Sequence, residues 1–151
     1  MTVNLFGDEW DDERDRPGWQ WKKLGVGRRL GAEKIGASLY ELAPGQQMFP
    51  YHWHQLMEEW VIVFRGEATL RDSNGERRIA AGDCVVFRTG PEGGHSVRND
   101  TDEPVRLMMF SSESDAEMIV YPDSGKVGLY GEDLLTILDQ SAELDYFHGE
   151  E

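Results

Sequence analysis

Residues 45–66 read GQQMFPYHWHQLMEEWVIVFRG, and this stretch decides both the fold class and the candidate site. His52 and His54 are two positions apart, so on a β-strand both imidazoles point to the same face of the sheet. Glu59 follows at the start of a continuous apolar run. Neutral imidazoles and a carboxylate are ligands that suit divalent first-row metals. The stretch therefore predicts part of a metal site carried on β-strands.

A second stretch, residues 82–99, reads GDCVVFRTGPEGGHSVRN and supplies a third histidine, His95. Together with His52, His54 and Glu59 it would give the metal four protein donors. Four donors leave positions open for water or a substrate when the metal is five- or six-coordinate. The cofactor expected is one divalent first-row ion, and the donors leave manganese, iron, nickel and zinc open.

The middle of the chain reads as short strands separated by turn residues. The expected strands cover 35–42, 47–54, 58–65, 67–71, 76–80, 83–88, 95–99 and 105–111. Asn74-Gly75 predicts a tight hairpin, because both residues tolerate a positive φ. Strands of this length and spacing, with no internal repeat, favour an all-β barrel or sandwich. The only helix expected covers 132–141, after the acidic pair Glu132-Asp133.

Side-chain alternation separates two neighbouring acids, Glu58 and Glu59. Glu59 shares its face with Val61 and Val63, which places it toward a barrel interior, whereas Glu58 would meet an arginine or solvent. The other face of the same strand is also apolar, with Trp60, Ile62 and Phe64. A strand that is apolar on both faces needs a second cover, either the ends of the chain or another subunit. We expect a homodimer.

Length and composition limit the function classes. At 151 residues the chain predicts a single domain with a full core, and no segment approaches the roughly 20 apolar residues of a membrane helix. The acidic N-terminus does not resemble a signal peptide, and one cysteine, Cys84, fits a reducing compartment, so a cytoplasmic location is expected. Cys84 is predicted to be a small buried hydrophobe because its surroundings are apolar.

The net charge of −14 is concentrated at the two ends of the chain. Residues 1–15 hold six acids and one arginine, and residues 132–151 hold seven acids without lysine or arginine. Such segments are typical of solvated ends, although adaptation to high salt would also explain them. With no basic patch, neither nucleic acid nor a membrane is an expected partner; a small molecule is.

The two stretches resemble the paired motifs of the cupin superfamily. The first motif is matched by His52, His54, Glu59 and Gly66, and the second by Gly82, His95 and Asn99. Arg88 stands where the second motif has proline, and the loop Thr89–Gly94 is about two residues longer than in the family pattern. The segment 121–128, YPDSGKVG, also resembles one found in small bacterial single-domain cupins.

This resemblance implies a double-stranded β-helix, or jelly-roll barrel, with the metal inside near one end. It implies that His52, His54, Glu59 and His95 form a mononuclear site of three histidines and one glutamate. The expected organisation is an N-terminal arm at 1–30, the barrel at 31–115 and an extension with an acidic tail at 116–151.

Two functions remain open at the level of sequence. One is a metal-dependent enzyme acting on a small polar molecule, such as an organic acid or a sugar derivative. The other is a non-catalytic, metal-dependent ligand-binding or sensing module. There is no nucleophile dyad, phosphate loop or dinucleotide fingerprint to choose between them. Asn99 is expected to make a structural hydrogen bond, His148 to lie on the surface, and Arg88 to form a salt bridge or hold a carboxylate.

Overall fold

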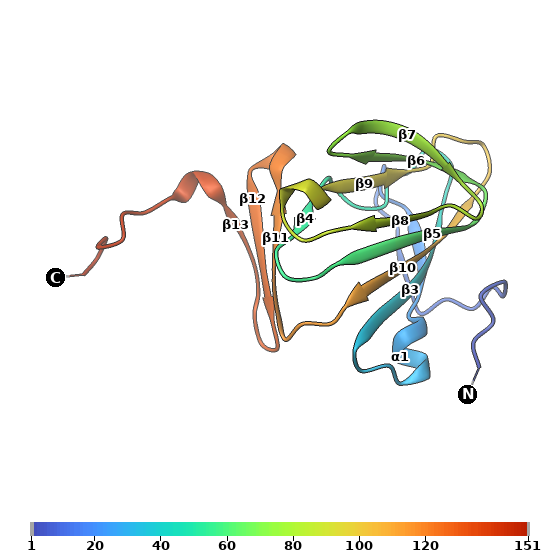
Figure 1. The fold of residues 1–151 in the computed structure, drawn as a ribbon, viewed down its shortest axis with the longest axis horizontal. Coiled ribbons are helices and arrows are strands. Elements are labelled where there is room, and N and C mark those ends of the chain that lie inside the picture. Colours follow the sequence, from blue (N-terminus) through green and yellow to red (C-terminus); the bar gives the residue numbers. More distant parts are fainter. Residues whose placement is uncertain (1, 151) are drawn as a thin grey trace.

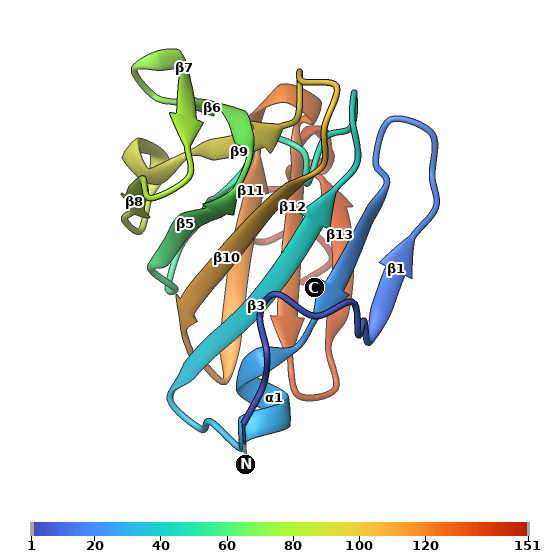
Figure 2. The ribbon, with the colours of Figure 1, turned by 90° about the vertical axis from the view of Figure 1, so that its right-hand side faces the viewer.

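Two layers of antiparallel strands face each other across an apolar core in the computed structural model, which describes residues 2–150 (Figure 1). The first layer is a six-stranded sheet. Its strands lie in the order β1 (Asp12–Arg14), β2 (Trp21–Leu24), β3 (Ile35–Leu42), β10 (Val105–Ser112), β5 (Glu59–Arg65) and β8 (Cys84–Phe87). Helix α1 (Val26–Leu30) connects β2 to β3 at one corner (Figure 2).

The second layer consists of two smaller sheets that meet along their edges, where the segment before β4 (Trp53–His54) runs antiparallel to the last strand of the other sheet. One contains β13 (Leu135–Asp139), β12 (Lys126–Gly131), β11 (Ala116–Tyr121) and β4; the other contains β7 (Gly75–Ala80), β6 (Glu67–Asp72) and β9 (His95–Arg98). A backbone bridge between His52 and His95 continues the layer from one sheet to the other. Its two N–H···O bonds measure 3.1 and 2.8 Å. This architecture confirms the predicted all-β jelly-roll barrel.

Most strands in the middle of the chain lie where the alternation of apolar residues predicts them. β3 covers 35–42 as expected, and β5 and β10 agree with their expected ranges to within one residue. The segment 47–54 differs, because only Trp53–His54 forms a strand, with isolated bridges at Gln47 and His52. Pro50 interrupts it, since proline has no N–H to donate to a neighbouring strand.

The predicted hairpin at Asn74-Gly75 is present between β6 and β7. Asp72 faces Gly75 across the turn, and Gly75 has a φ of +113°. Asn74 does not adopt a positive φ; its N–H donates instead to Oδ1 of Asp72 at 2.8 Å.

The predicted helix at 132–141 is wrong. Residues 135–139 form strand β13, which is antiparallel to β12. Leu135 faces Tyr130 at one end of this pair of strands, and Asp139 faces Lys126 at the other. A short 3-10 turn follows at Gln140–Ala142. The apolar run LLTIL fits either structure by hydrophobicity. Pairing with the neighbouring strand decides the outcome, since Gly131 and Leu134 close a hairpin through their own backbone hydrogen bonds.

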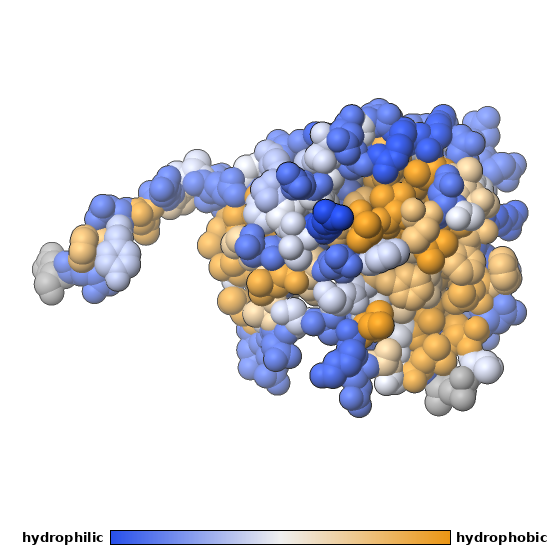
Figure 3. Space-filling view, viewed as in Figure 1, coloured by the Kyte–Doolittle hydropathy of each residue, from blue (hydrophilic) through white to orange (hydrophobic). Residues whose placement is uncertain are grey.

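The outer face of the six-stranded sheet is covered in part by the chain's own N-terminus. Val3, Leu5 and Trp10 pack on a small cluster of outward-facing side chains; these are Leu24, Val26, Leu39, Met108, Ala37, Ile62, Phe64 and Phe110. Trp60 stays 43% exposed and Val86 39% exposed. Apolar side chains are visible on this side of the molecule in Figure 3.

Cys84 is exposed, and the prediction that it is buried is wrong. Strand β8 is the edge of its sheet, and alternation places Cys84 with Val86 on the outer face. Phe87 and Val85 take the inner positions and pack in the core. The apolar run around Cys84 therefore reflects a strand with two apolar faces.

The ends of the chain leave the barrel differently. Arg106, only 5% exposed, holds the N-terminal arm through Asp8 and the carbonyl groups of Leu5 and Gly7. The C-terminal residues 143–150 are exposed and extend away from the barrel (Figure 1). Within the described chain, no helix has the length and apolar character needed to span a bilayer.

Candidate metal centre

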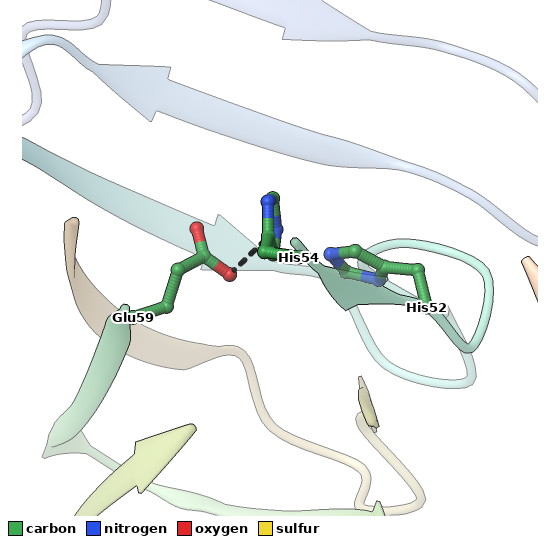
Figure 4. A group of neighbouring side chains, drawn as sticks. All are labelled: His52, His54 and Glu59. Atoms are coloured by element: carbon green, nitrogen blue, oxygen red, sulfur yellow. Dashed lines mark ion pairs between the residues drawn. The ribbon is translucent and has the colours of Figure 1, made fainter. Parts of the chain in front are cut away.

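Three of the four predicted ligands come together at the junction between the two layers. His54 lies on β4, His52 lies just before it, and Glu59 is the first residue of β5 (Figure 4). One potential ligand atom from each residue lies within 4.8 Å of the other two. His52 and His54 are each 7% exposed, so the group is enclosed by the barrel.

His95, the first residue of β9, completes the cluster from the opposite side. Its Nε2 lies 3.2 Å from Oε2 of Glu59, and Nε2 of His54 lies at the same distance from that oxygen. Neither contact is aligned as a hydrogen bond, and both buried nitrogens lack a hydrogen-bond partner among the described residues. The imidazole rings of His52 and His95 are 4.6 Å apart, centre to centre.

Backbone carbonyl groups orient two of the imidazoles. Nδ1 of His52 donates to the carbonyl of Pro50 at 2.8 Å, and Nδ1 of His95 donates to that of Gly93 at 2.9 Å. These bonds assign the proton of the neutral ring to Nδ1, so each Nε2 presents a lone pair to the cluster. Lone pairs that converge on the Glu59 carboxylate repel one another unless a cation lies between them. The donor set therefore fits a metal ion, with the second ring nitrogens held as in known metal sites.

The pKa values of His52 and His54 are shifted in opposite directions by their surroundings. Burial lowers the pKa of His52 to about 3, and the neighbouring charges of His95 and His54 act in the same direction, so His52 is neutral at physiological pH. Burial also opposes protonation of His54, but the close contact with the Glu59 carboxylate and its negative charge outweigh the effect of burial and raise the pKa of His54. Burial alone would raise the pKa of Glu59; contacts with His54 and His95 instead hold it well below its usual range.

The unusual loop before His95 has a structural explanation. Residues Pro91–Gly93 form a 3-10 turn, and the N–H of Gly90 donates to the carbonyl of His54 at 2.8 Å. A Cβ atom added at Gly93 would lie 1.6 Å from the carbonyl oxygen of Arg88, so this position requires glycine. The loop thus links the backbones that carry His54 and His95. The side chain of Arg88 is exposed and does not line the cavity at the cluster.

The sequence analysis missed Glu117, a buried acid on β11. Its carboxylate accepts N–H groups of three consecutive residues, Gln55, Leu56 and Met57, at 3.0, 3.1 and 2.8 Å, and that of Met118 at 2.7 Å. These three residues belong to the loop that joins His54 to Glu59. A lone acid 58 positions after Glu59 carries no sequence signal for this role.

A cavity of about 420 Å³ opens beside the cluster. Its lining combines the cluster with aromatic and basic side chains: Arg14, Tyr40, Phe49, Pro50, His52, His54, Glu59, Ile119, Tyr121, Lys126, Tyr130 and Ile137. The hydroxyl groups of Tyr121 and Tyr130 are 3.2 Å apart. Burial, followed by the contact with Tyr130, raises the pKa of Tyr121, so its phenol stays protonated. A pocket with polar groups converging beside buried titratable residues is typical of a small-molecule site.

The remaining predicted residues lie outside the cluster. Glu58 is exposed and accepts a hydrogen bond from Nε1 of Trp60 at 2.9 Å, as expected for the outward-facing acid. Asn99 is fully buried and makes structural hydrogen bonds, donating to the carbonyl groups of Leu42 and Glu103, which confirms its predicted role. His148 is exposed in the C-terminal tail.

A family model described as "Cupin domain" matches residues 38–111 of the chain. That range contains both sequence motifs and all four candidate ligands. No curated protein sequence matches the chain significantly.

Solved structures share the fold over most of the chain. A protein from Acidithiobacillus ferrooxidans, whose assignment as a sugar phosphate isomerase is provisional, is 26% identical, with a TM-score of 0.81 over 88% of this chain and 86% of that one. A sugar phosphate isomerase of the cupin superfamily from Silicibacter pomeroyi is 24% identical, with a TM-score of 0.84 over 97% and 98%. A Thermotoga maritima protein provisionally assigned as an oxalate decarboxylase is 17% identical, with a TM-score of 0.63 over 76% and 100%.

Proposed function

Because this chain belongs to the cupin superfamily, we propose that it binds one divalent first-row metal ion and uses it to bind or transform a small polar molecule. The proposed ligands are His52, His54, Glu59 and His95, and manganese, iron, nickel and zinc all suit this donor set. The proposed small molecule is an organic acid or a sugar derivative.

One observation carries the metal site. Nε2 of His54 and Nε2 of His95 are buried, lack hydrogen-bond partners within the described chain, and face the same carboxylate oxygen of Glu59. Leaving several buried polar atoms unpaired is costly, at about 1–3 kcal/mol for each group. A bound cation removes that cost at all three residues together. This supports ligation over a purely structural role for the histidines.

A bound metal would supply Lewis-acid activation of an oxygen or nitrogen group, and with iron also redox chemistry. The residues of the chain supply the remaining functions. The barrel buries His52, His54 and His95, and the backbone carbonyls of Pro50 and Gly93 fix two of the imidazole orientations. Tyr121 and Tyr130 present hydroxyl groups to the cavity, where they can donate to oxygen atoms of a bound molecule.

Similarity to known structures supports a sugar derivative as the small molecule. The Acidithiobacillus ferrooxidans protein, at 26% identity over most of both chains, is provisionally assigned to sugar phosphate isomerisation. A polar cavity with phenol groups suits a polyhydroxylated molecule better than an apolar one.

A substrate screen with the metal-loaded chain distinguishes a metal-dependent enzyme from a non-catalytic ligand-binding module. Organic acids and sugar derivatives are incubated with the protein, and product formation and thermal stabilisation are recorded together. Product formation that requires the metal supports the enzyme. Stabilisation without product instead supports the non-catalytic binding or sensing module that the same site would serve.

A homodimer and a cytoplasmic location remain predictions. Exposed Trp60 and Val86, next to the part of the outer face that the N-terminus covers, support a second subunit on the six-stranded sheet. Light scattering of the purified chain measures its molar mass in solution. A monomer at micromolar concentration would contradict the predicted homodimer.

A further inference from the structure

The cavity beside the cluster is lined by more lysine and arginine than acidic side chains, whereas the chain as a whole is acidic. The sequence has 29 acidic residues and 15 lysines and arginines. Among the described residues that line this cavity, however, the bases are Arg14 and Lys126 and the only acid is Glu59. A divalent ion with Glu59 ionised and the histidines neutral leaves one positive charge, and the two bases raise it to three. Such a cavity selects negatively charged molecules.

Aromatic rings hold the two bases at the cavity wall. The guanidinium of Arg14 lies 4.8 Å from the centre of the Trp21 ring, and Nζ of Lys126 lies 5.5 Å from that of Tyr121. Neither base has a carboxylate within 4.0 Å among the residues described, whereas Arg71 and Arg106, also over rings, are ion-paired. Stacking on a ring leaves the N–H donors of a cation available to a ligand.

The same rings connect the bases to the candidate metal ligands. Tyr121 stacks on His52 with centres 5.9 Å apart, and it faces Lys126 directly across the β11–β12 hairpin. Both residues belong to the segment 121–128, which resembles a segment of other small cupins but contains none of the candidate ligands. On the other side, Trp21 packs edge-on against Tyr40, which also lines the cavity. Packed rings therefore place Lys126 beside the cluster, and Arg14, which is itself exposed, contacts a buried ring that packs against the cavity wall.

We propose that Arg14 and Lys126 form an oxyanion subsite that holds a phosphate or carboxylate group while the rest of the molecule reaches the metal. This inference rests on the proposed function and narrows its ligand to a small molecule that carries at least one anionic group. Charge-assisted hydrogen bonds from both bases give the affinity, and the phenol groups of Tyr121 and Tyr130 contact the polar body of the molecule.

Titration calorimetry on the metal-loaded full chain tests the subsite with three probes: glucose 6-phosphate, gluconate and uncharged glucose. Glucose 6-phosphate, gluconate or both should bind at least about tenfold more tightly than glucose, and which of them binds distinguishes phosphate from carboxylate. Arg14→Gln together with Lys126→Gln should reduce this preference to the part that the metal ion alone contributes. Lys22→Gln, an exposed lysine on β2 that does not line this cavity, is the matched control and should keep it.

Equal affinity for glucose and the anions, no binding of any probe at millimolar concentration, or an unchanged preference in the double variant would overturn the subsite. The metal content of the same samples separates this result from failure of the proposed function. A chain without metal contradicts the metal site alone, because Arg14 and Lys126 do not need the ion to attract an anion. The chelator-treated chain should accordingly keep a weaker preference for anions, which the double variant loses.

Discussion

Oε2 of Glu117 lies 3.7 Å from Nδ1 of His54, on the opposite side of the imidazole from Glu59. The same carboxylate accepts the backbone N–H groups of residues 55–57, which connect His54 to Glu59 along the chain. One buried side chain thus contacts a candidate ligand and the loop between two candidate ligands. Partners of this kind typically set the orientation and basicity of a metal-binding histidine.

Glu117→Gln is predicted to weaken metal affinity by about 10- to 100-fold while the chain still folds, because the amide keeps one acceptor oxygen but loses the charge facing His54. Competition with a chromophoric chelator measures this affinity. Glu58→Gln is the control, since Glu58 is exposed on the outer face. Equal metal affinity in both variants and in the wild type would show that Glu117 supports only the backbone.

Gly93→Ala is predicted to destabilise the chain by about 1–3 kcal/mol and to reduce metal binding. The added methyl group would lie 1.6 Å from the carbonyl oxygen of Arg88, so the turn that carries the acceptor for His95 must move. Gly131→Ala is the matched control, because its nearest neighbour would lie at an ordinary 3.6 Å. Chemical denaturation and metal titration of both variants test this, and similar values for the two would contradict it.

The sequence predicted which of these side chains lie together better than it predicted some of the surrounding elements, for a physical reason. Alternation along β5 separates Glu59 from Glu58, and the two-residue spacing of His52 and His54 places them together on any extended segment. The run at 134–138 has no such constraint, because continuous apolar residues suit a helix and a strand equally.

Other parts of the site depend on tertiary structure and have no local sequence signal. Glu117 acts on a loop about 60 residues earlier in the chain, and Arg14 and Lys126 reach one cavity from opposite ends of the sequence. Cys84 shows the converse limit, since an apolar neighbourhood does not reveal which face of a strand is covered.

Arg106→Met is predicted to destabilise the chain by about 2–3 kcal/mol and to release the N-terminal arm. The buried guanidinium bonds to Glu41 and Asp8 at 2.7 Å each and to the carbonyls of Leu5 and Gly7, and methionine keeps only the packing. Limited proteolysis detects the released arm. Arg65→Met, at the neighbouring exposed position on β5, should leave cleavage and stability unchanged; the prediction fails if both variants behave alike.

Asp11 gives the fold a defined pH dependence. A hydrogen bond from Arg29, followed by one from the N–H of Gly25, lowers its pKa from 3.8 to about 2. Folding therefore favours the ionised carboxylate, and its contribution is complete above the unfolded pKa and is lost as the pH falls through the folded one. The stability difference between wild type and Asp11→Asn should be constant near neutral pH and shrink between about pH 4 and pH 2. A difference that does not vary with pH would contradict this assignment.

The metal content of the purified chain tests the central claim most directly. Elemental analysis should find close to one divalent first-row ion per chain, and His52→Ala combined with His54→Ala should remove it while circular dichroism still reports the β-barrel. A chain that contains no such metal, and takes up none when manganese, iron, nickel or zinc is added, would contradict the account.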